Sequence, residues 1–255
     1  MNKHLSEQTI LITGGTSRLG SSLVEKAVQS GARVFFTYYS QASRARELES
    51  SGAQALPLDL SDTENMTTFA RQMREKTKHL DVIIHNAAAV RDKTIKNLSE
   101  EEWDYVMRVN LKAPYVLTKE LMPLLFRAAK NQAKQEKDGA GAKIFFLISR
   151  LGLQGGVGVS NYSAAKAGLL GLCKSLAKEL SKKKILVNAV NPGFMDSKMT
   201  QGLPEAAIQE NLEAGLIRGY SNPEEVADFL LYLCSEAMNQ VSGQVFHYES
   251  RNVRI

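Results

Sequence analysis

The strongest constraint on the fold is a glycine-rich turn near the N-terminus, set between an apolar run and a helical pattern. Residues 9–12 are apolar and lead into Thr13-Gly14-Gly15-Thr16-Ser17-Arg18-Leu19-Gly20, after which residues 21–28 follow a helical pattern. Gly31 ends that pattern, and residues 33–37 predict a second buried strand. This order is typical of the first unit of a dinucleotide-binding fold, where the helix N-terminus faces a pyrophosphate.

The alternation of strands and helices continues along the chain. Further strands are predicted at 53–58, 81–84, 143–148, 185–190 and 244–247. Helices are predicted at 42–51, 63–78, 99–109, 111–130, 160–181 and 223–235, with a loop and short helix at 195–214. The pattern predicts an α/β protein: a single-domain Rossmann fold over residues 1–255, with a doubly wound seven-stranded parallel sheet and helices on both faces.

Charge and composition narrow the range of partners. The net charge of +5 permits anionic ligands such as phosphates but falls short of a nucleic-acid-binding footprint. No apolar run reaches the roughly 18–20 residues that cross a bilayer, and no signal-peptide core is visible. Cys173 and Cys234 provide neither a disulfide framework nor a metal set. We therefore expect a cytoplasmic protein without a bound metal.

A tyrosine and a lysine four residues apart, Tyr162 and Lys166, lie in a run of good helix formers. Four residues rise about 6 Å in a helix, so both side chains share one face. An ammonium beside a phenol favours the phenolate and makes the phenol a better proton donor. The spacing alone proves little, because Tyr115 and Lys119 repeat it. An isolated pair of this kind is usually a helix-surface contact.

Polar residues also follow the predicted strands, where ligands bind in open α/β sheets. They are the glycine turn, Asp59, Asn86, Ser149 and Asn191-Pro192-Gly193. Taken in order with Tyr162 and Lys166, these residues resemble the short-chain dehydrogenase/reductase family over essentially the whole chain. Within that family, residues 86–92, 102–104, 109–111, 161–168, 191–200 and 223–227 are most similar to bacterial 3-oxoacyl-(acyl-carrier-protein) reductases.

The resemblance implies a catalytic role for four residues. Tyr162 would donate the proton to a substrate carbonyl oxygen, and Lys166 would lower the tyrosine pKa and hold the nicotinamide ribose. Ser149, thirteen residues before Tyr162, would hydrogen-bond the same carbonyl oxygen. Asn110 would break its helix and hold a water that relays protons from Lys166. Tyr115 has no serine at the matching spacing and is expected to be structural.

The predicted cofactor is NADPH/NADP+. The second strand ends in Thr37-Tyr38-Tyr39-Ser40 without the acidic residue that would repel a 2′-phosphate. Arg18 replaces the middle glycine of the family turn, as in the pteridine reductases of the family, and is expected to meet the 2′-phosphate or the pyrophosphate. Its alternative role is that of a solvent-facing residue. The expected cofactor residues are Thr13, Gly14, Ser17, Arg18, Leu19, Gly20, Tyr39, Ser40, Asp59, Leu60, Asn86, Ala87, Ala88, Tyr162, Lys166, Pro192, Gly193 and Met195.

The substrate is less constrained. Apolar residues 151–156, Phe194 and a lid at about 195–214 suit an acyl chain, which favours reduction of a 3-oxoacyl group in fatty-acid biosynthesis. An acidic acyl carrier protein would need a basic patch, for which Arg127, Lys130, Lys134 and residues 182–184 are candidates. His85, Ala88, Arg150 and residues 247–251 depart from the family pattern.

Three alternatives remain open at this point. The chain is also compatible with a pteridine-reductase-like enzyme, with a reductase of another ketone or a polyketide, and with a catalytically idle NADP-binding protein. The family usually assembles through helices corresponding to 111–130 and 160–180, so a homotetramer or homodimer is expected.

Overall fold

A seven-stranded parallel sheet forms the centre of the computed structural model, which describes residues 5–134, 141–197 and 199–251. The strand order is β3-β2-β1-β4-β5-β6-β7, and every neighbouring pair is parallel. The strands are β1 Thr9–Ile12, β2 Arg33–Tyr38, β3 Gln54–Pro57, β4 Val82–His85, β5 Ala142–Leu147, β6 Ile185–Asn191 and β7 Val245–His247. The predicted fold is confirmed.

Helices connect successive strands. They are α1 Arg18–Gln29, α2 Ala42–Glu49, α3 Thr63–Lys76, α4 Glu100–Met107, α5 Ala113–Lys134, α6 Leu151–Gln154, α7 Ser160–Leu180, α8 Glu205–Glu213 and α9 Pro223–Cys234. Short 3₁₀ turns follow α7 and α9 at Ser181–Lys183 and Glu236–Met238. The short helix α6 was not predicted, because four residues carry no readable helical period.

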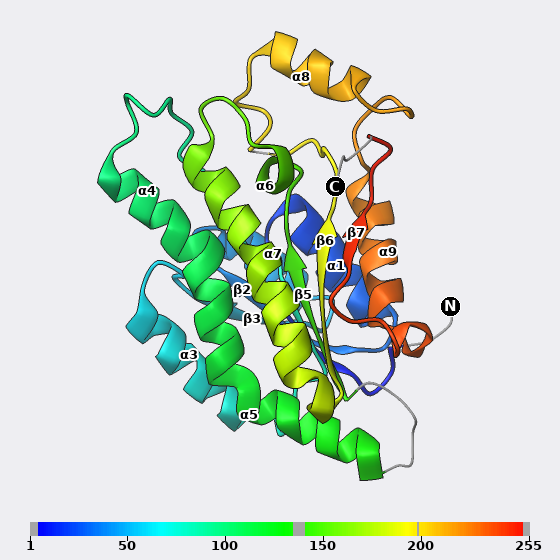
Figure 1. Cartoon of the computed structure of the whole chain (residues 1–255). Coiled ribbons are helices and arrows are strands. Elements are labelled where there is room, and N and C mark those ends of the chain that lie inside the picture. The colour runs from blue at the N-terminus through cyan, green and yellow to red at the C-terminus, as the bar shows by residue number, and fades with distance from the viewer. Residues whose placement is uncertain (1–4, 135–140, 198, 252–255) are drawn as a thin grey trace.

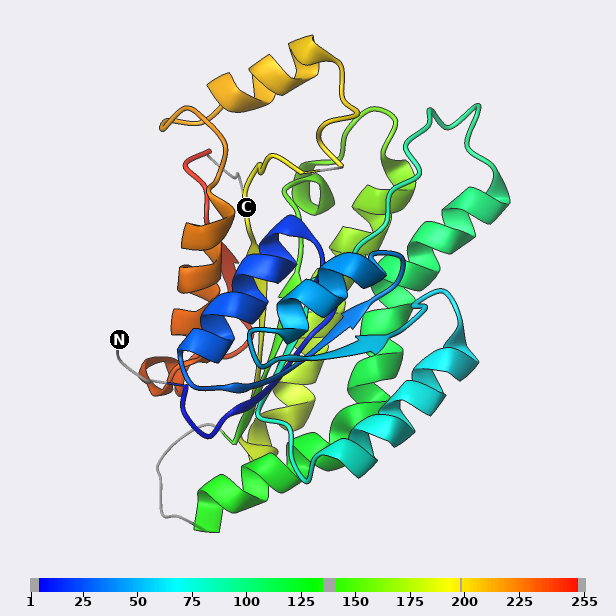
Figure 2. The ribbon, with the colours of Figure 1, turned by 180° about the vertical axis from the view of Figure 1, so that it is seen from behind.

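The helices cover both faces of the sheet. One face packs against α3, α5 and α7 (Figure 1), and the other against α1, α2 and α9 (Figure 2). Side chains that alternate along a strand enter opposite cores. In β1, Leu11 joins the first core, while Ile10 and Ile12 join the second. Burial on both faces explains why the strands are continuous apolar runs.

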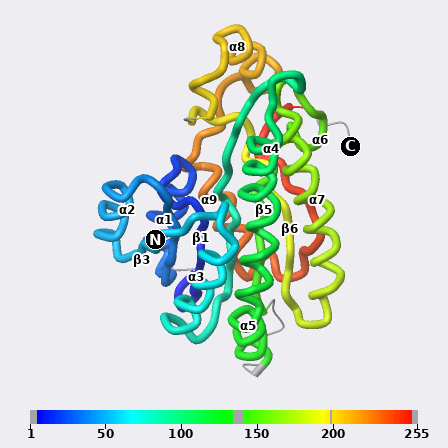
Figure 3. The backbone as a smooth tube through the Cα atoms, turned by 90° about the vertical axis from the view of Figure 1, so that its left-hand side faces the viewer, coloured from blue at the N-terminus to red at the C-terminus, as the bar shows by residue number. Residues whose placement is uncertain are grey.

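The order of the strands fixes where a ligand can bind. The chain winds from β1 outward to β3, then returns to place β4 on the other side of β1. A crevice therefore opens at the carboxyl ends of β1 and β4, the topological switch point at which such sheets bind ligands. Helix α8 stands beyond this same edge, away from the sheet (Figure 3).

Side-chain caps set several helix boundaries. Asp62 accepts hydrogen bonds from the backbone N–H groups of Glu64 and Asn65 at the start of α3. Ser99 and Glu102 form a reciprocal capping box at the start of α4. A less expected cap is Lys143 of β5, whose buried ammonium donates to the carbonyls of Leu233, Cys234 and Ser235 at the end of α9.

The predicted break between two helices at Asn110 is a π-helical turn instead. Residues Arg108–Lys112 widen the helix between α4 and α5 without interrupting it. Such a turn inserts one extra residue and is frequent at functional sites. The polar segment 130–142 continues α5 as far as Lys134, while residues 135–140 lie outside the described residues.

Within residues 5–134, 141–197 and 199–251, no helix combines the length and the apolar character that a bilayer crossing requires. In the same part of the chain, no three His, Cys, Asp or Glu side chains are grouped to hold a metal ion. Cys173 and Cys234 are both buried free thiols.

Candidate active site

The glycine turn after β1 brings the backbone close to the end of β4. Gly14 has a φ of 66°, in the left-handed region that favours glycine, and a Cβ there would lie 2.9 Å from the Cα of Ala87. A Cβ at Gly20 would lie 2.2 Å from the carbonyl oxygen of Gly14. Ser17 caps α1 by accepting a hydrogen bond from the Gly20 N–H. Only glycine fits this turn, so α1 begins directly at the crevice.

Asn86 ties the turn to β4. Its Nδ2 donates to the carbonyl oxygens of Thr13, at 2.9 Å, and Gly14, at 3.1 Å. The Thr13 hydroxyl accepts from the backbone N–H groups of Asn86 and Ala87, both at 3.0 Å. These bonds hold the two ends of the switch point in one rigid unit.

A cavity of about 650 Å³ follows this edge of the sheet. It runs from Tyr39, Ser40 and Asp59 at one end to Tyr162 and Lys166 at the other. Of the predicted cofactor residues, all except Thr13, Gly20 and Gly193 line it. Thr13 and Gly20 stand behind the lining and shape the turn, while Gly193 packs against Ser221 and Tyr248.

Tyr162 lines the end of the cavity that is formed by β5 and α7, and Ser149, which is not part of the lining, is its hydrogen-bond partner. The pKa of Tyr162 is raised to about 12, chiefly by burial and to a smaller extent by Asp92, while the hydrogen bond with Ser149 lowers it. The phenol is therefore protonated at neutral pH, which is the form that can donate a proton to an oxygen atom of a substrate. Ser149 also accepts a hydrogen bond from the Leu151 N–H at 3.2 Å, which orients its hydroxyl.

Lys166 is buried one helical turn below the tyrosine. Its ammonium donates to the carbonyl oxygen of Leu147 at 2.6 Å and lies 5.6 Å from the centre of the Tyr162 ring. Burial lowers the Lys166 pKa to about 8. The predicted lowering of the tyrosine pKa by this lysine is not seen, because burial dominates the pKa of Tyr162.

Asn110 is buried in the π turn, and its side chain is hydrogen-bonded to the backbone of Ala89. Its Oδ1 accepts from the Ala89 N–H at 2.7 Å, and its Nδ2 donates to the Ala89 carbonyl at 2.8 Å. The amide therefore pins the segment after β4.

His85 at the end of β4 is a buried neutral imidazole. It stacks on Phe146 at 5.1 Å between ring centres, and its Nε2 lies 2.9 Å from the Thr118 hydroxyl. Burial, with a contribution from the charge on Lys166, lowers its pKa to about 3. His85 thus supports the site from behind and does not line the cavity.

Arg18 reaches across the cavity mouth rather than towards Tyr39 and Ser40. Its guanidinium forms an ion pair with the carboxylate of Asp196 and donates to the Asp196 carbonyl at 3.1 Å. This pairing lowers the Asp196 pKa. Among the described residues of the cavity lining, only Arg18 and Lys166 are basic.

The basic residues expected to receive a carrier protein are misplaced for that role within one chain. Lys182 follows Tyr162 by twenty residues along α7, which corresponds to about 30 Å of helix. Figure 1 shows the ends of α5 and α7 opposite the edge that carries α6 and α8. The prediction of a basic patch beside the site is wrong, because these residues lie at or beyond the C-terminal ends of α5 and α7, whereas Tyr162 lies near the N-terminus of α7.

The sequence did not identify several residues that line the cavity. Tyr105 and Val109 reach it from α4 and the π turn, and Asp196, Met199 and Gln201 reach it from the segment between β6 and α8. The four-residue spacing of Tyr105 and Val109 is the only signal that placed them on one face, and it is shared by ordinary core residues.

Comparisons with known proteins agree with this geometry. Residues 15–250 match the family model described as Enoyl-(Acyl carrier protein) reductase. The 3-oxoacyl-(acyl-carrier-protein) reductase FabG of Aquifex aeolicus is 32% identical over 254 residues, covering 97% of this chain and 98% of its own length. The enzyme of the same name from Thermotoga maritima is 33% identical over 246 residues, covering 94% and 96%.

Two solved structures are similar along the whole chain. The Pseudomonas aeruginosa RhlG/NADP active-site complex superposes with a TM-score of 0.87 at 27% identity, covering 98% of both chains. A short-chain dehydrogenase from Burkholderia cenocepacia in complex with NADP gives a TM-score of 0.85 at 25% identity, covering 97% of this chain and 98% of that one.

The cavity at the switch point, with Tyr162 and Lys166 at one end and Ser149 hydrogen-bonded to the tyrosine, defines a dinucleotide-dependent oxidoreductase. The chain belongs to the short-chain dehydrogenase/reductase family, and it is an oxidoreductase acting on CH–OH and C=O groups.

Proposed function

We propose that this protein is an NADPH-dependent reductase that converts 3-oxoacyl groups carried on an acyl carrier protein into 3-hydroxyacyl groups in the cytoplasm. The observation that carries the proposal is the hydrogen bond between Ser149 and Tyr162, whose ring lines the cavity that begins at the glycine turn. Two neighbouring hydroxyl groups suit an oxygen atom, and hence a carbonyl, better than a carbon–carbon double bond.

The residues fit a dinucleotide. The backbone at Gly14 leaves no room for a Cβ, so a phosphate can approach the turn at the N-terminus of α1. No acidic residue stands in residues 37–40 to repel a 2′-phosphate. Two similar structures, RhlG and the Burkholderia cenocepacia protein, are complexes with NADP. When bound, NADPH supplies the hydride for the carbonyl carbon.

This chain's own residues supply the proton and the charge stabilisation. Tyr162 donates its phenolic proton to the carbonyl oxygen, and the O–H bond of the product alcohol forms as that of the tyrosine breaks. Ser149 donates a hydrogen bond to the same oxygen while negative charge develops there. Lys166, charged below a pKa of about 8, stabilises the phenolate that is left. Asn110 holds the segment that forms the nearby wall.

The acyl and carrier-protein assignments rest on the relatives, several of which are named 3-oxoacyl-(acyl-carrier-protein) reductases. The description of the family model names an enoyl reductase, which would reduce the double bond of a carrier-bound acyl group instead.

A carrier protein is acidic and would need exposed cations near the cavity. Such cations lie in the loop before α4, at Arg91, Lys93 and Lys96. Assembly as a homotetramer or homodimer belongs to the same proposal, as does the description of residues 195–214 as a lid.

A substrate panel tests the proposal. NADPH oxidation is followed with acetoacetyl and longer 3-oxoacyl thioesters on acyl carrier protein and on coenzyme A, with the matching 2-enoyl thioesters, and with a pterin. We expect turnover of the 3-oxoacyl thioesters only, faster on the carrier protein. Turnover of the pterin alone, or of the enoyl thioesters alone, would contradict the proposed 3-oxoacyl substrate and identify the compound that is reduced as the substrate class. Tight NADPH binding without any turnover would indicate an idle binding protein.

A further inference from the structure

The lid helix α8 has little apolar contact with the rest of the molecule. None of its residues is buried, although Ile208 and Leu212 are half-buried. Figures 1 and 2 show α8 projecting beyond the carboxyl ends of the strands. A helix without a buried apolar face depends on polar links for its position, because burial supplies most of the stability of a packed helix.

Two arginines from distant segments meet on one side chain of α8. Arg150 Nη2 donates to Asn211 Oδ1 at 2.9 Å, and Arg251 Nη1 donates to the same oxygen at 3.0 Å. Asn211 Nδ2 donates to the Ala207 carbonyl, one turn earlier in α8, at 2.8 Å. The orientation of the amide is thus determined by its partners, since guanidinium groups only donate.

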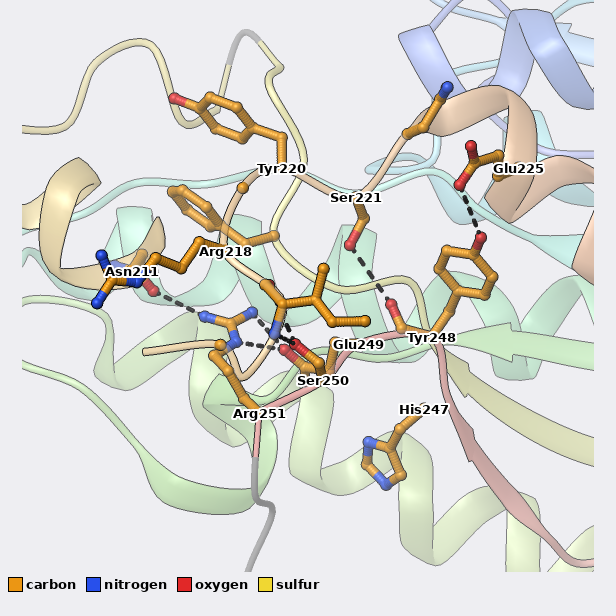
Figure 4. A pocket seen from close by; sticks show the side chains of 15 residues that line it. Asn211, Arg218, Tyr220, Ser221, Glu225, His247, Tyr248, Glu249, Ser250 and Arg251 are labelled. Atoms are coloured by element: carbon orange, nitrogen blue, oxygen red, sulfur yellow. Dashed lines mark hydrogen bonds and ion pairs between the residues drawn. The ribbon is translucent and has the colours of Figure 1, made fainter. Parts of the chain in front are cut away.

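Each arginine is anchored to the sheet. Arg150 directly follows Ser149 at the end of β5 and also donates to Gln154 of α6. Arg251 forms an ion pair with Glu249, and the two side chains are only 8% and 3% exposed. Glu249 in turn accepts a hydrogen bond from Asn191, the last residue of β6. Figure 4 shows the Arg251 guanidinium lying between Asn211 and Glu249.

The charges in this cluster are close to balance. Burial, and then repulsion from Arg251, lowers the Arg150 pKa, whereas Glu249 and Glu210 raise it. The neutral oxygen of Asn211 accepts from both cations, and a hydrogen bond to a charged group is stronger than one between neutral groups. The two departures from the family pattern, Arg150 and residues 247–251, therefore meet at one point of the lid.

We propose that Asn211 is a positioning residue for the substrate: its amide oxygen, held by Arg150 and Arg251, fixes α8 over the reaction site. The lid segment that leads to α8 also lines the cavity, at Met195, Met199 and Gln201. Loss of the Asn211 oxygen releases the far end of that segment and loosens the substrate cleft. This inference rests on the proposed reductase function only for its kinetic readout.

Hydrogen–deuterium exchange of the whole protein tests the link directly. In Asn211→Ala, backbone amides 205–213 are expected to exchange at least five-fold faster than in the wild type. Asn211→Asp keeps an acceptor oxygen and is expected to exchange at or below the wild-type rate. Gln209→Ala, an exposed change on the same helix, serves as the control and leaves the exchange rate unchanged. Equal exchange in Asn211→Ala and the wild type overturns the proposal.

Kinetics with a 3-oxoacyl thioester provide the second readout. Asn211→Ala is expected to raise KM about ten-fold with kcat within two-fold, and Asn211→Asp to restore KM. A loss of kcat and thermal stability without a change in KM would indicate a merely structural residue and reject the role. If Asn211→Ala does not fold, Arg150→Met removes one donor and is read in the same way. If the wild type reduces no ketone, the proposed function fails. The exchange experiment then still decides whether Asn211, held by Arg150 and Arg251, fixes α8.

Discussion

Arg18, the first residue of α1, is paired with Asp196 of the segment between β6 and α8, across the mouth of the cavity. The guanidinium points towards the β6 side and away from Tyr39 and Ser40, where the 2′-phosphate of a bound cofactor would lie. It is therefore placed to meet the pyrophosphate, which NADPH and NADH share. Asp196 competes with that anion for the same cation.

Asp196→Asn should consequently tighten NADPH binding. An exposed ion pair is weak, so its removal should give roughly a two- to five-fold lower Kd. Fluorescence titration without substrate measures it. Asp228→Asn breaks a similar pair between α9 and Lys26 of α1, away from the cavity, and should leave Kd unchanged.

Arg18→Ala should weaken the binding of NADPH and of NADH by similar factors. A selective loss of NADPH binding would assign the 2′-phosphate to Arg18.

Tyr39 lies at the other end of the cavity, is 68% exposed, and follows a strand without an acidic residue. Tyr39→Asp would place a carboxylate near the expected 2′-phosphate. We predict at least a ten-fold higher Kd for NADPH with little change for NADH, because like charges repel. Tyr39→Asn is the matched control, since it removes the ring without adding charge. Equal losses in the two variants would locate the 2′-phosphate elsewhere.

Tyr162→Phe should remove the proton donor while preserving the cavity. General acid catalysis contributes about 10²–10⁴-fold, so kcat should fall by at least a hundred-fold. NADPH titration should give a Kd within three-fold of the wild type. The chain offers an internal control in Tyr115, which is four residues from Lys119 but lies exposed on α5. Tyr115→Phe should keep full activity, and substantial turnover by Tyr162→Phe would require another acid.

The pH dependence of reduction should report the charge on Lys166. Reduction needs a protonated Tyr162 and a charged Lys166, and burial sets the lysine pKa at about 8 and the tyrosine pKa at about 12. The kcat/KM should therefore be flat between pH 6 and 7 and should fall as pH rises through about 8. Steady-state assays from pH 6 to 10 test this. A profile that stays level to pH 10 would contradict a role for the lysine charge in the free enzyme.

His85 should make the fold sensitive to mild acid. Its pKa is about 3 in the folded protein against 6.5 for the free side chain, so between these values the unfolded chain binds one more proton. The free energy of unfolding therefore falls as pH decreases through 6.5, by up to about 1.4 kcal/mol per pH unit from this group. Urea unfolding at several pH values from 4.5 to 7 gives the free energy of unfolding at each pH. The slope of this free energy against pH should be smaller by that amount in His85→Asn than in the wild type. An identical slope would mean that His85 is charged in the folded state.

The period of the apolar residues was sufficient to predict the fold. Seven apolar runs alternating with helical patterns allow few arrangements other than a doubly wound parallel sheet, because strands buried on both faces need helices on both sides. Part of the glycine turn was equally local. Gly20 is required by contacts within the turn, whereas Gly14 is required by the approach of Ala87 from the end of β4.

Contacts between distant segments could not be predicted in this way. The sequence marked Arg150 and residues 247–251 as unusual, but only the folded chain brings both onto Asn211, since side-chain direction depends on packing. The same holds for Arg18, which is directed to Asp196, and for Asn110, which is engaged by Ala89.

The sequence by itself therefore determined the sheet, the glycine turn and the order of the polar residues that follow the strands, because each depends on local geometry and on the period of burial. The tertiary structure alone decided the protonation of Tyr162 and Lys166 and the attachment of α8. Both depend on burial and on partners that lie on other elements of the fold, and neither leaves a local signal.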